Sequence, residues 1–188
     1  GSIQSDKQSQ LDDAIYTWRR ILEWDPSALQ ALEELDALYT RQEDWFNLLD
    51  VLRRKQALVD EAAWIDAQFR IAGLYEDPEC LDHTTEAIEA HRALLDRAPE
   101  HRPSIDALET LVATRDERDQ AFAVLRPILE LHGAYEELWD QYEVVASHQG
   151  DDPFVKVKTL HEMATLAEGE LADVHRAFGA QARAFVLD

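Results

Sequence analysis

Cysteine, glycine and proline are all scarce in this chain of 188 residues. The one cysteine, Cys80, cannot form a disulfide within the chain, and a lone thiol leaves the cellular compartment open. Six scattered glycines cannot build the glycine-rich loop that cradles a phosphate group. No apolar run is long enough to cross a bilayer. With a hydrophobic share of 46%, these shortages favour an ordered, helix-rich protein.

Basic residues are also few, with 18 lysines and arginines against 39 aspartates and glutamates, and the formal net charge is −21. Nucleic-acid binding depends on neutralising phosphates with Lys and Arg, so this balance argues against it. The same charge argues against attachment to an anionic membrane surface. Two interpretations of the acidity remain: it keeps an elongated protein soluble, or it attracts a basic partner.

The familiar catalytic and metal-binding patterns are incomplete. His161 and Glu162 begin like the zinc-protease pattern HExxH, but Thr165 stands where the second histidine belongs. Residues 80–83 include a cysteine, an aspartate and a histidine, without a second Cys or His at ligand spacing. The sequence therefore predicts a protein that is not an enzyme, with no catalytic residue, no metal site and no cofactor.

Apolar residues recur along the chain at helical spacing, as Ile15, Trp18 and Leu22 do. No segment alternates with period two for long enough to form a strand. The sequence therefore predicts an all-α fold of about ten helices. The expected helices lie near residues 10–24, 29–41, 44–58, 64–76, 84–97, 102–113, 121–131, 138–145, 153–169 and 174–187.

Several helix ends carry recognisable capping residues. Ser27 with Gln30 forms a capping box that would open the second helix. Gly133 and Gly150 suit the left-handed position after a helix. Asp152 before a proline predicts a cap with proline at the first helical position.

The chain also repeats itself. Residues 14–26, AIYTWRRILEWDP, return 73 positions later as residues 87–99, AIEAHRALLDRAP, and a looser third copy occupies 177–188. A fixed period is the signature of a stacked repeat protein, in which each unit contacts its neighbours. In the second copy His91 takes the place of Trp18, and we expect it to be a half-buried spacer between helices.

Two different offsets compete in the middle of the chain. The segment 51–54, VLRR, returns 73 positions later as VLRP, which ends at Pro127. However, Trp45 and the three leucines that follow it at helical spacing match Tyr135 and its apolar successors at an offset of 90. Both offsets cannot be in phase with simple helix pairs, and an interior proline should kink or split a helix. We therefore expect an irregular, extra or broken helix near 117–133.

The spacing Ala-x3-large-x2-small-x4-Pro, after a helix with its own large apolar positions, resembles the second helix of the tetratricopeptide repeat (TPR). First helices of that motif are recognisable at 29–41, 65–76, 102–113 and 157–168. The resemblance implies an α-solenoid of about ten antiparallel helices wound into a right-handed superhelix. The chain is also similar to long bacterial repeat proteins in which such units run on for many copies.

In the TPR family a small residue stands where two helices touch, and Ala72 and Ala164 fill that position here. Asp36 and Glu109 take it in the other two first helices, which suggests wider helix separation there. The resemblance therefore covers most of the chain but follows the family pattern loosely.

These patterns predict a single TPR-like domain over residues 11–188. Residues 1–10 are polar and without period, and the opening Gly-Ser resembles a tag-cleavage scar, so we expect this segment to be frayed. Because the last copy stops before its proline, we expect the chain to be a piece of a longer array.

In the TPR family the first helices line a concave face that holds peptides or a helix of another protein. Carried over residue by residue, the resemblance implies these partner-binding residues: Gln30, Glu33, Asp66, Phe69, Glu76, Asp106, Thr110, Lys158 and His161. Such a surface is acidic on its first three helices and mixed on the last, so a basic or amphipathic segment would suit it. The alternative is that these positions are ordinary solvated surface. The family's clamp of Lys, Arg and Asn for C-terminal carboxylates is absent.

Three functions remain open. The first is a non-catalytic protein-interaction scaffold that binds a peptide or helix of a partner on the acidic face. The second is a self-association module, in which exposed terminal helix faces stack on another copy, or a structural spacer in a larger repeat protein. The third is a helical regulatory or catalytic part of an enzyme. The repeat signature favours the scaffold.

Overall fold

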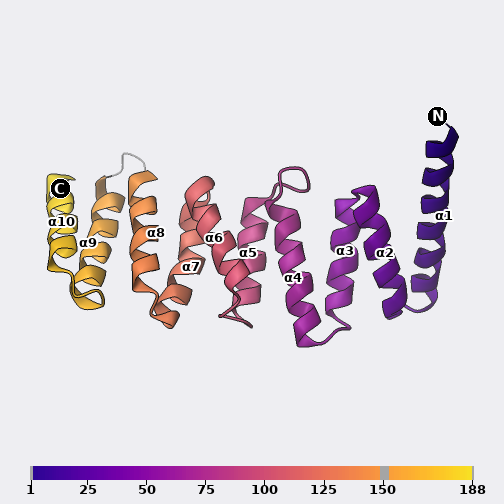
Figure 1. Ribbon diagram of the computed structural model, residues 1–188, viewed down its shortest axis with the longest axis horizontal. Coiled ribbons are helices and arrows are strands. Elements are labelled where there is room, and N and C mark those ends of the chain that lie inside the picture. Colours follow the sequence, from indigo (N-terminus) through magenta and orange to yellow (C-terminus); the bar gives the residue numbers. More distant parts are fainter. Residues whose placement is uncertain (1, 149–152, 188) are drawn as a thin grey trace. The chain divides into compact units, whose positions relative to one another are not determined.

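Ten helices make up most of residues 2–148 and 153–187, the part of the chain that this computed structural model describes, with side chains from residue 9 onward (Figure 1). Their bounds are α1 Ser2–Trp24, α2 Leu29–Gln42, α3 Trp45–Gln56, α4 Glu61–Glu76, α5 Thr84–Leu95, α6 Arg102–Thr114, α7 Arg118–His132, α8 Tyr135–His148, α9 Pro153–Gly169 and α10 Val174–Leu187. No strand occurs within these described ranges. The predicted all-α fold is confirmed.

Contacts between helices divide the chain into two compact units, Gly1–Ala98 (unit 1) and Pro99–Asp188 (unit 2). In unit 1 each helix from α1 to α4 packs on the helix that follows it, and α6 to α9 do the same in unit 2. In unit 2, α6 also packs on α8. This packing of sequence neighbours is the solenoid architecture that the repeats predict.

Each unit has its own apolar core, formed by the inward stripes of its helices. Unit 1 buries Leu32, Leu35, Leu48, Leu52 and Ile71, and unit 2 buries Leu108, Leu125, Leu129, Leu138 and Met163. These residues recur three or four positions apart within a helix, which places them on one helical face. Among the described helices, none has both the length and the apolar character needed to span a membrane.

The two units are built alike at an offset of 90 residues. At this offset α1 to α5 correspond in order to α6 to α10. The described residues with positive φ obey the same offset: Glu43 (56°) pairs with Gly133 (64°), and Asp82 (49°) pairs with Ala172 (51°). A non-glycine residue rarely adopts such a φ, so the matched turns indicate a common backbone plan.

The loops before α5 and α10 are closed by equivalent hydrogen bonds. His83 N–H donates to the Tyr75 carbonyl at 2.8 Å, and Asp173 N–H donates to the Ala167 carbonyl at 2.8 Å. The buried residues of α4 and α9 match at an offset of 92: Ala67, Gln68, Ile71, Ala72 and Tyr75 correspond to Thr159, Leu160, Met163, Ala164 and Ala167. The chain therefore gains two residues before α9 and loses two after it, and the offset of 90 is restored in α10.

The N-terminal part of the chain differs from the sequence prediction. Helix α1 begins at Ser2, whereas the apolar pattern placed its start near residue 10. The capping box at α2 does not form, because the Ser27 hydroxyl and N–H both donate to the Asp25 carboxylate, at 2.7 and 3.0 Å. Ala28 is the residue before α2, and its side chain makes no capping hydrogen bond.

The disputed segment near 117–133 forms one helix, α7, with Pro127 in its interior. Because proline has no backbone N–H, α7 lacks one intrahelical hydrogen bond at Pro127, and this is its irregularity. The segment contains neither an extra helix nor a break. Gly133 ends this helix in the left-handed conformation, as predicted. The other two predicted caps, Gly150 and Asp152, lie outside the described residues.

Candidate functional site

The nine predicted partner-binding residues lie on four helices, α2 and α4 in unit 1 and α6 and α9 in unit 2. The exposed ones are Gln30, Glu33, Asp66, Asp106, Thr110, Lys158 and His161, and the half-buried ones are Phe69 and Glu76. The structure brings some of them into local clusters, which differ between the two units.

In unit 1, Phe69 and Glu76 of α4 both contact His91 of α5. The Glu76 carboxylate is hydrogen-bonded to Nε2 of His91, and the ring centroids of Phe69 and His91 are 6.0 Å apart. His91 is fully buried, which corrects the prediction of a half-buried spacer. A buried imidazole needs such a partner, and Glu76 supplies it. Glu76 therefore contributes to the packing of α4 on α5, although its side chain remains partly exposed.

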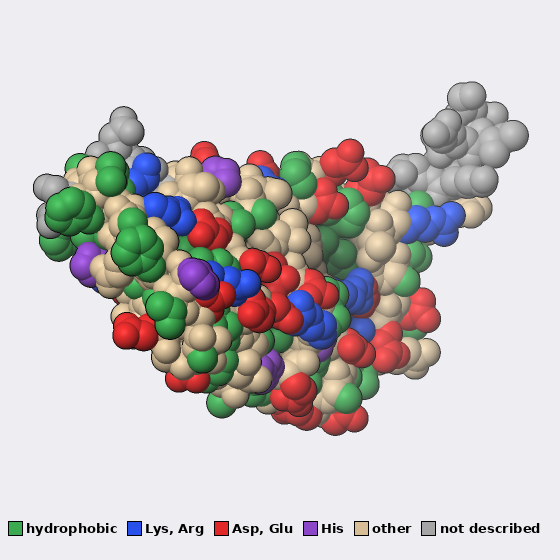
Figure 2. Space-filling view, turned by 60° about the vertical axis from the view of Figure 1, so that its left-hand side comes forward, with side chains coloured by type: hydrophobic (Ala, Val, Ile, Leu, Met, Phe, Trp, Pro, Cys, Tyr) green, Lys and Arg blue, Asp and Glu red, His purple; other side chains and the backbone are tan. Residues whose placement is uncertain are grey.

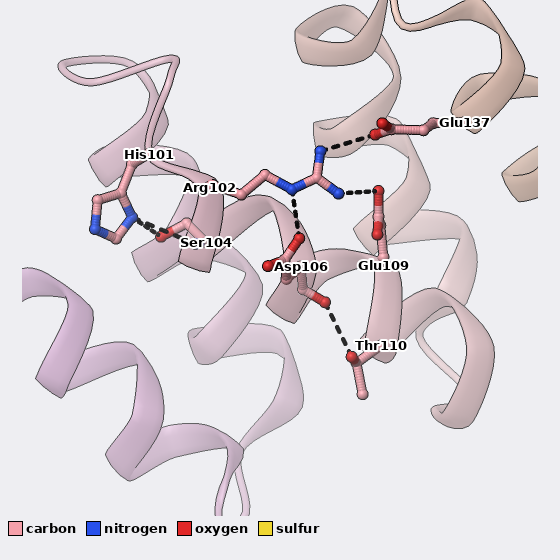
Figure 3. Close-up of polar contacts among 7 residues, drawn as sticks. All are labelled: His101, Arg102, Ser104, Asp106, Glu109, Thr110 and Glu137. Carbon is pink, nitrogen blue, oxygen red and sulfur yellow. Dashed lines mark hydrogen bonds and ion pairs between the residues drawn. The ribbon is translucent and has the colours of Figure 1, made fainter.

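In unit 2, Arg102 at the start of α6 gathers three carboxylates (Figure 3). Its Nε donates to Asp106 at 2.6 Å, its Nη1 to Glu137 at 2.8 Å and its Nη2 to Glu109 at 3.5 Å. The hydrogen bond to Glu137 raises the pKa of Arg102 further above its usual range. The Thr110 hydroxyl donates to the backbone carbonyl of Asp106 at 2.9 Å. Two predicted contact residues, Asp106 and Thr110, thus belong to one acidic cluster.

The cluster around Arg102 explains how a carboxylate occupies the small position of α6. Burial raises the pKa of Glu109, the charge of Arg102 opposes that rise, and Glu137 and Asp106 add to it. One guanidinium therefore compensates three carboxylates, and the cluster keeps an excess of negative charge. Figure 2 shows such mixing of Asp and Glu with Lys and Arg on the face that it displays.

A cleft of about 470 Å³ lies between α7, α8 and α9 of unit 2. We call it the α9 cleft. The residues that carry its chemistry are Arg126, Glu130, Tyr135, Tyr142, Glu162 and Glu170. Two leucines, Leu138 and Leu166, supply apolar lining between these polar groups. The cleft is therefore amphipathic, with carboxylates, phenol rings and aliphatic surface within one volume.

Glu162 is the centre of a hydrogen-bond network in the α9 cleft. Its Oε2 accepts from Arg126 Nη1 at 3.1 Å and from the Tyr142 hydroxyl at 3.2 Å. Arg126 Nε also donates to Glu130 at 2.8 Å, and its guanidinium lies 5.7 Å from the centroid of the Tyr142 ring. Burial and the charge of Glu162 raise the pKa of Tyr142, so its hydroxyl remains a donor. This network fixes the two walls formed by α7 and α9.

The opposite rim of the α9 cleft carries Tyr135 and Glu170. The charge of Glu170 raises the pKa of Tyr135, with lesser contributions from burial and the hydrogen bond between them. Across the whole cleft, three glutamates face one arginine. A cationic group that enters would find carboxylates and tyrosine ring faces, both of which attract cations.

A second depression, of about 420 Å³, lies on the outer side of α9. It is lined by Phe154, Val157, Lys158 and His161, and it shares Glu162 and Thr165 with the α9 cleft. Lys158 Nζ lies 4.0 Å from Glu162 Oε1. The predicted residues Lys158 and His161 therefore line the depression, which adjoins the cleft through Glu162 and Thr165. We call the cleft and this depression together the α9 surface.

Sequence reasoning missed the α7 and α8 side of the α9 surface. The sequence pattern places Tyr135 and Tyr142 at the core positions of Trp45 and Leu52, and the TPR resemblance implies contact residues on first helices alone. Tyr142 is indeed buried, but its hydroxyl reaches the cleft. The available signal was a pair of tyrosines seven residues apart, which share one face of a helix.

Across residues 2–148 and 153–187, no cluster of three or more His, Cys, Asp or Glu side chains is arranged to hold a metal ion. Cys80 lies half-buried in the loop before α5, and burial raises the pKa of its thiol. A raised thiol pKa lowers nucleophilicity at neutral pH, so this position does not resemble an activated cysteine.

No protein-family model matches the chain, and no curated protein matches its sequence. Among solved structures, the crystal structure of MamA is similar over 98% of this chain and 92% of MamA, with 14% identity and a TM-score of 0.39. The crystal structure of BtubC (BKLC) from P. vanneervenii is similar over 95% of this chain and 88% of that protein, with 14% identity and a TM-score of 0.36. Similarities at this level assign neither a family nor a function.

Proposed function

We propose that this chain is a non-catalytic protein-interaction scaffold of the TPR-like type, and that unit 2 binds a basic segment of a partner protein on the α9 surface. The α9 cleft is the observation that carries the proposal, because it combines size, aromatic rings and a surplus of carboxylates. A flat solvated helix face offers none of these together. Among the predicted contact residues, Lys158 and His161 would lie at the edge of the bound segment.

The cleft matches the chemistry of a lysine or arginine side chain. Glu130 and Glu170 offer carboxylates at the rim, and Tyr135 offers a ring face beside them. Arg126 already neutralises part of this charge through Glu130 and Glu162. The remaining negative charge would guide a basic segment to the site and weaken with added salt.

The depression on α9 would hold the residue next to the basic one. Phe154 and Val157 give it apolar walls, and their neighbours Lys158 and His161 are polar. An amphipathic segment with one basic and one apolar side chain would therefore contact both halves of the α9 surface. The unit 1 residues Gln30, Glu33 and Asp66 are proposed as a second, acidic contact area, supported by their exposure on α2 and α4.

Selection of short random peptides on the full chain tests the proposal. We expect the selected peptides to be enriched in Lys and Arg and to bind less tightly as salt rises. The variant Glu130→Lys with Glu170→Lys should weaken their binding about ten-fold or more, because both rim charges are reversed. Isothermal titration calorimetry would give the dissociation constants.

A matched control uses two exposed carboxylates outside the α9 surface. Asp116→Lys with Asp119→Lys changes the net charge by the same amount in the same unit. Peptide binding should be retained in this control. Equal weakening in both double variants, or peptides without enrichment in basic residues, would contradict the proposal. Glu33→Lys with Asp66→Lys then asks whether unit 1 contributes.

A further inference from the structure

Helices α8, α9 and α10 of unit 2 border an apolar pocket of about 460 Å³. Helix α9 lies between the other two in Figure 1 and contacts both of them. We call this volume the α10 pocket. Its apolar lining comes from all three helices: Ala146, Leu160, Ala182, Val186 and Leu187. Small-molecule sites have volumes of about 300 to 1,000 Å³, so the pocket is large enough for a small organic ligand.

Two cationic side chains, Lys156 and Arg183, complete the lining of the α10 pocket. Arg183 Nη1 donates to both carboxylate oxygens of Glu143, at 2.8 and 2.9 Å, so its charge is already balanced. Lys156 is half-buried and makes no ion pair with a carboxylate of the described residues. Among those residues, no aspartate or glutamate lines the pocket. A half-buried cation without a carboxylate partner favours an anion beside it.

In unit 1 the equivalent position is closed by the side chains of the unit itself. Gln56 Nε2 donates to Gln68 Oε1 at 2.7 Å, and Gln68 Nε2 donates to the Ala90 carbonyl at 2.9 Å. The guanidinium of Arg97 lies 3.9 Å from the centroid of the Trp64 ring. These contacts bridge α3, α4 and the segment of α5, so long polar and aromatic side chains occupy this part of unit 1.

Unit 2 cannot make these contacts, because its residues differ. The equivalents of the four residues that close unit 1, at an offset of 90 in α8 and α10 and of 92 in α9, are Ala146 for Gln56, Lys156 for Trp64, Leu160 for Gln68 and Leu187 for Arg97. Alanine and leucine cannot form the amide pair, and lysine and leucine cannot form the contact between a cation and a ring. The α10 pocket is therefore the open equivalent of a position that unit 1 fills internally.

We propose that the α10 pocket binds a small amphipathic carboxylate, whose apolar body lies between α8, α9 and α10 and whose carboxylate pairs with Lys156 Nζ. The aliphatic lining removes hydrocarbon from water, which is favourable, and Lys156 selects an anionic head group. The net charge of −21 opposes the approach of an anion, but salt at physiological strength screens that repulsion beyond about 8 Å.

The proposal is independent of the α9 surface, because no residue lines both places. The α9 surface combines carboxylates with phenol rings, whereas the α10 pocket combines aliphatic side chains with a cation. The two sites therefore select ligands of opposite charge, and either proposal can fail without the other.

Titration of the full chain with sodium octanoate, followed by ¹H–¹⁵N NMR spectra, tests this proposal. Octanoate is the probe because it joins a flexible hydrocarbon chain to one carboxylate. We expect saturable shifts that are confined to the amides of α8, α9 and α10 around the pocket. Octanol, which has the same chain without a charge, should bind about ten-fold more weakly, because it cannot form the ion pair with Lys156.

The variant Lys156→Met removes the charge and keeps an unbranched side chain. It should weaken octanoate binding about ten-fold and change octanol binding by less than about two-fold. Lys158→Met is the matched control, because it removes the same charge from the same helix, but Lys158 lines the depression of the α9 surface. This control should bind octanoate like the wild type.

The variant Ala182→Phe tests the volume of the pocket independently of its charge. Ala182 is exposed on α10 and lines the pocket, so a ring there should fill the space without disturbing the core. Both probes should lose their binding, while circular dichroism shows an unchanged helix content.

Several results would overturn the proposal. Equal octanoate affinity in Lys156→Met and Lys158→Met would show that Lys156 does not hold the head group. Equal affinity of the wild type for octanol and octanoate would indicate a surface for apolar groups in general, such as side chains of another protein. Shifts spread over both units, or no saturable shift at all, would exclude the α10 pocket as the site.

Discussion

Asp36 is a buried carboxylate that two cations hold between α2, α3 and α4. Its oxygens accept from Arg70 at 2.7 and 2.8 Å and from Lys55 at 3.0 Å. Burial alone would raise the pKa of Asp36, but the hydrogen bonds and charges of Arg70 and Lys55 outweigh it, so the pKa is lowered. Ion pairs thus accommodate the charged residue at the position that is small in the TPR motif. From the sequence alone, a charged residue there suggests a wider separation of the helices.

Replacement of this carboxylate should destabilise unit 1. For Asp36→Asn we expect a loss of about 2 kcal/mol at neutral pH, because two part-buried charge-assisted contacts are weakened and Lys55 loses its partner. Since the folded-state pKa is lowered, this stabilisation is full above the ordinary value of 3.8 and is lost as the pH falls through the folded-state pKa. Urea unfolding should therefore show that the difference in the free energy of unfolding between the wild type and Asp36→Asn becomes smaller in acid.

Asp50 provides the control for this substitution. It pairs with Arg54 at 3.9 Å on an exposed part of α3. Exposed pairs contribute little, so Asp50→Asn should change the free energy of unfolding by less than about 0.5 kcal/mol. If the difference in the free energy of unfolding between the wild type and Asp36→Asn is the same at neutral and at acid pH, the charge of Asp36 is not what stabilises unit 1.

At the scale of the helix, Pro127 interrupts the hydrogen bonding of α7. Pro127→Ala should stabilise unit 2 by about 1 to 3 kcal/mol, because the interior N–H is restored, less the loss of proline's restriction on the unfolded chain. Pro103 is the control, because it lies in the first turn of α6, where no intrahelical donor is required. Pro103→Ala should be neutral or slightly destabilising. Thermal unfolding followed by circular dichroism compares the two, and equal effects would contradict this explanation.

The matched turns after α2 and α7 differ in their left-handed residue. Glu43 and Gly133 both adopt positive φ, and glycine does so without steric cost. We expect Glu43→Gly to stabilise unit 1 by about 1 kcal/mol and Gly133→Ala to destabilise unit 2 by a similar amount. Chemical unfolding of each variant measures these changes. The opposite sign in either variant would mean that the two turns are not equivalent.

At the scale of the whole molecule, the two units repeat one plan with different surfaces. Each residue pair at the offset of 90 compares the same position in two settings, as Ile88 and Phe178 do on α5 and α10. The residue equivalent to Asp36 at this offset is Arg126. Unit 1 therefore has a negative charge at this position, where unit 2 has a positive one. Differences of this kind, and not the shared helices, give unit 2 its cleft and leave Phe178 and Phe185 of α10 exposed.

Binding of basic segments to the α9 surface should weaken with salt, because it depends on attraction between unlike charges.

Part of the candidate site was predictable from local pattern, and part was not. Lys158 and His161 line the depression of the α9 surface, and their helix is recognisable by its resemblance to a TPR first helix. Tyr135 and Tyr142 belong to α8, whose apolar spacing indicated core packing and no more. A periodic pattern shows which face of a helix is buried, but it does not show which polar tips reach a neighbouring helix.

By itself, the sequence determined the helices, most of their ends and the existence of a repeat, because these depend on residues within a few turns of each other. It contained both offsets, 73 and 90, without a means to choose between them. Tertiary structure made that choice through the turns at Glu43 and Gly133 and at Asp82 and Ala172, whose left-handed backbone sequence letters do not reveal. It also decided which equivalent faces are buried, because burial depends on contacts between helices distant in the chain.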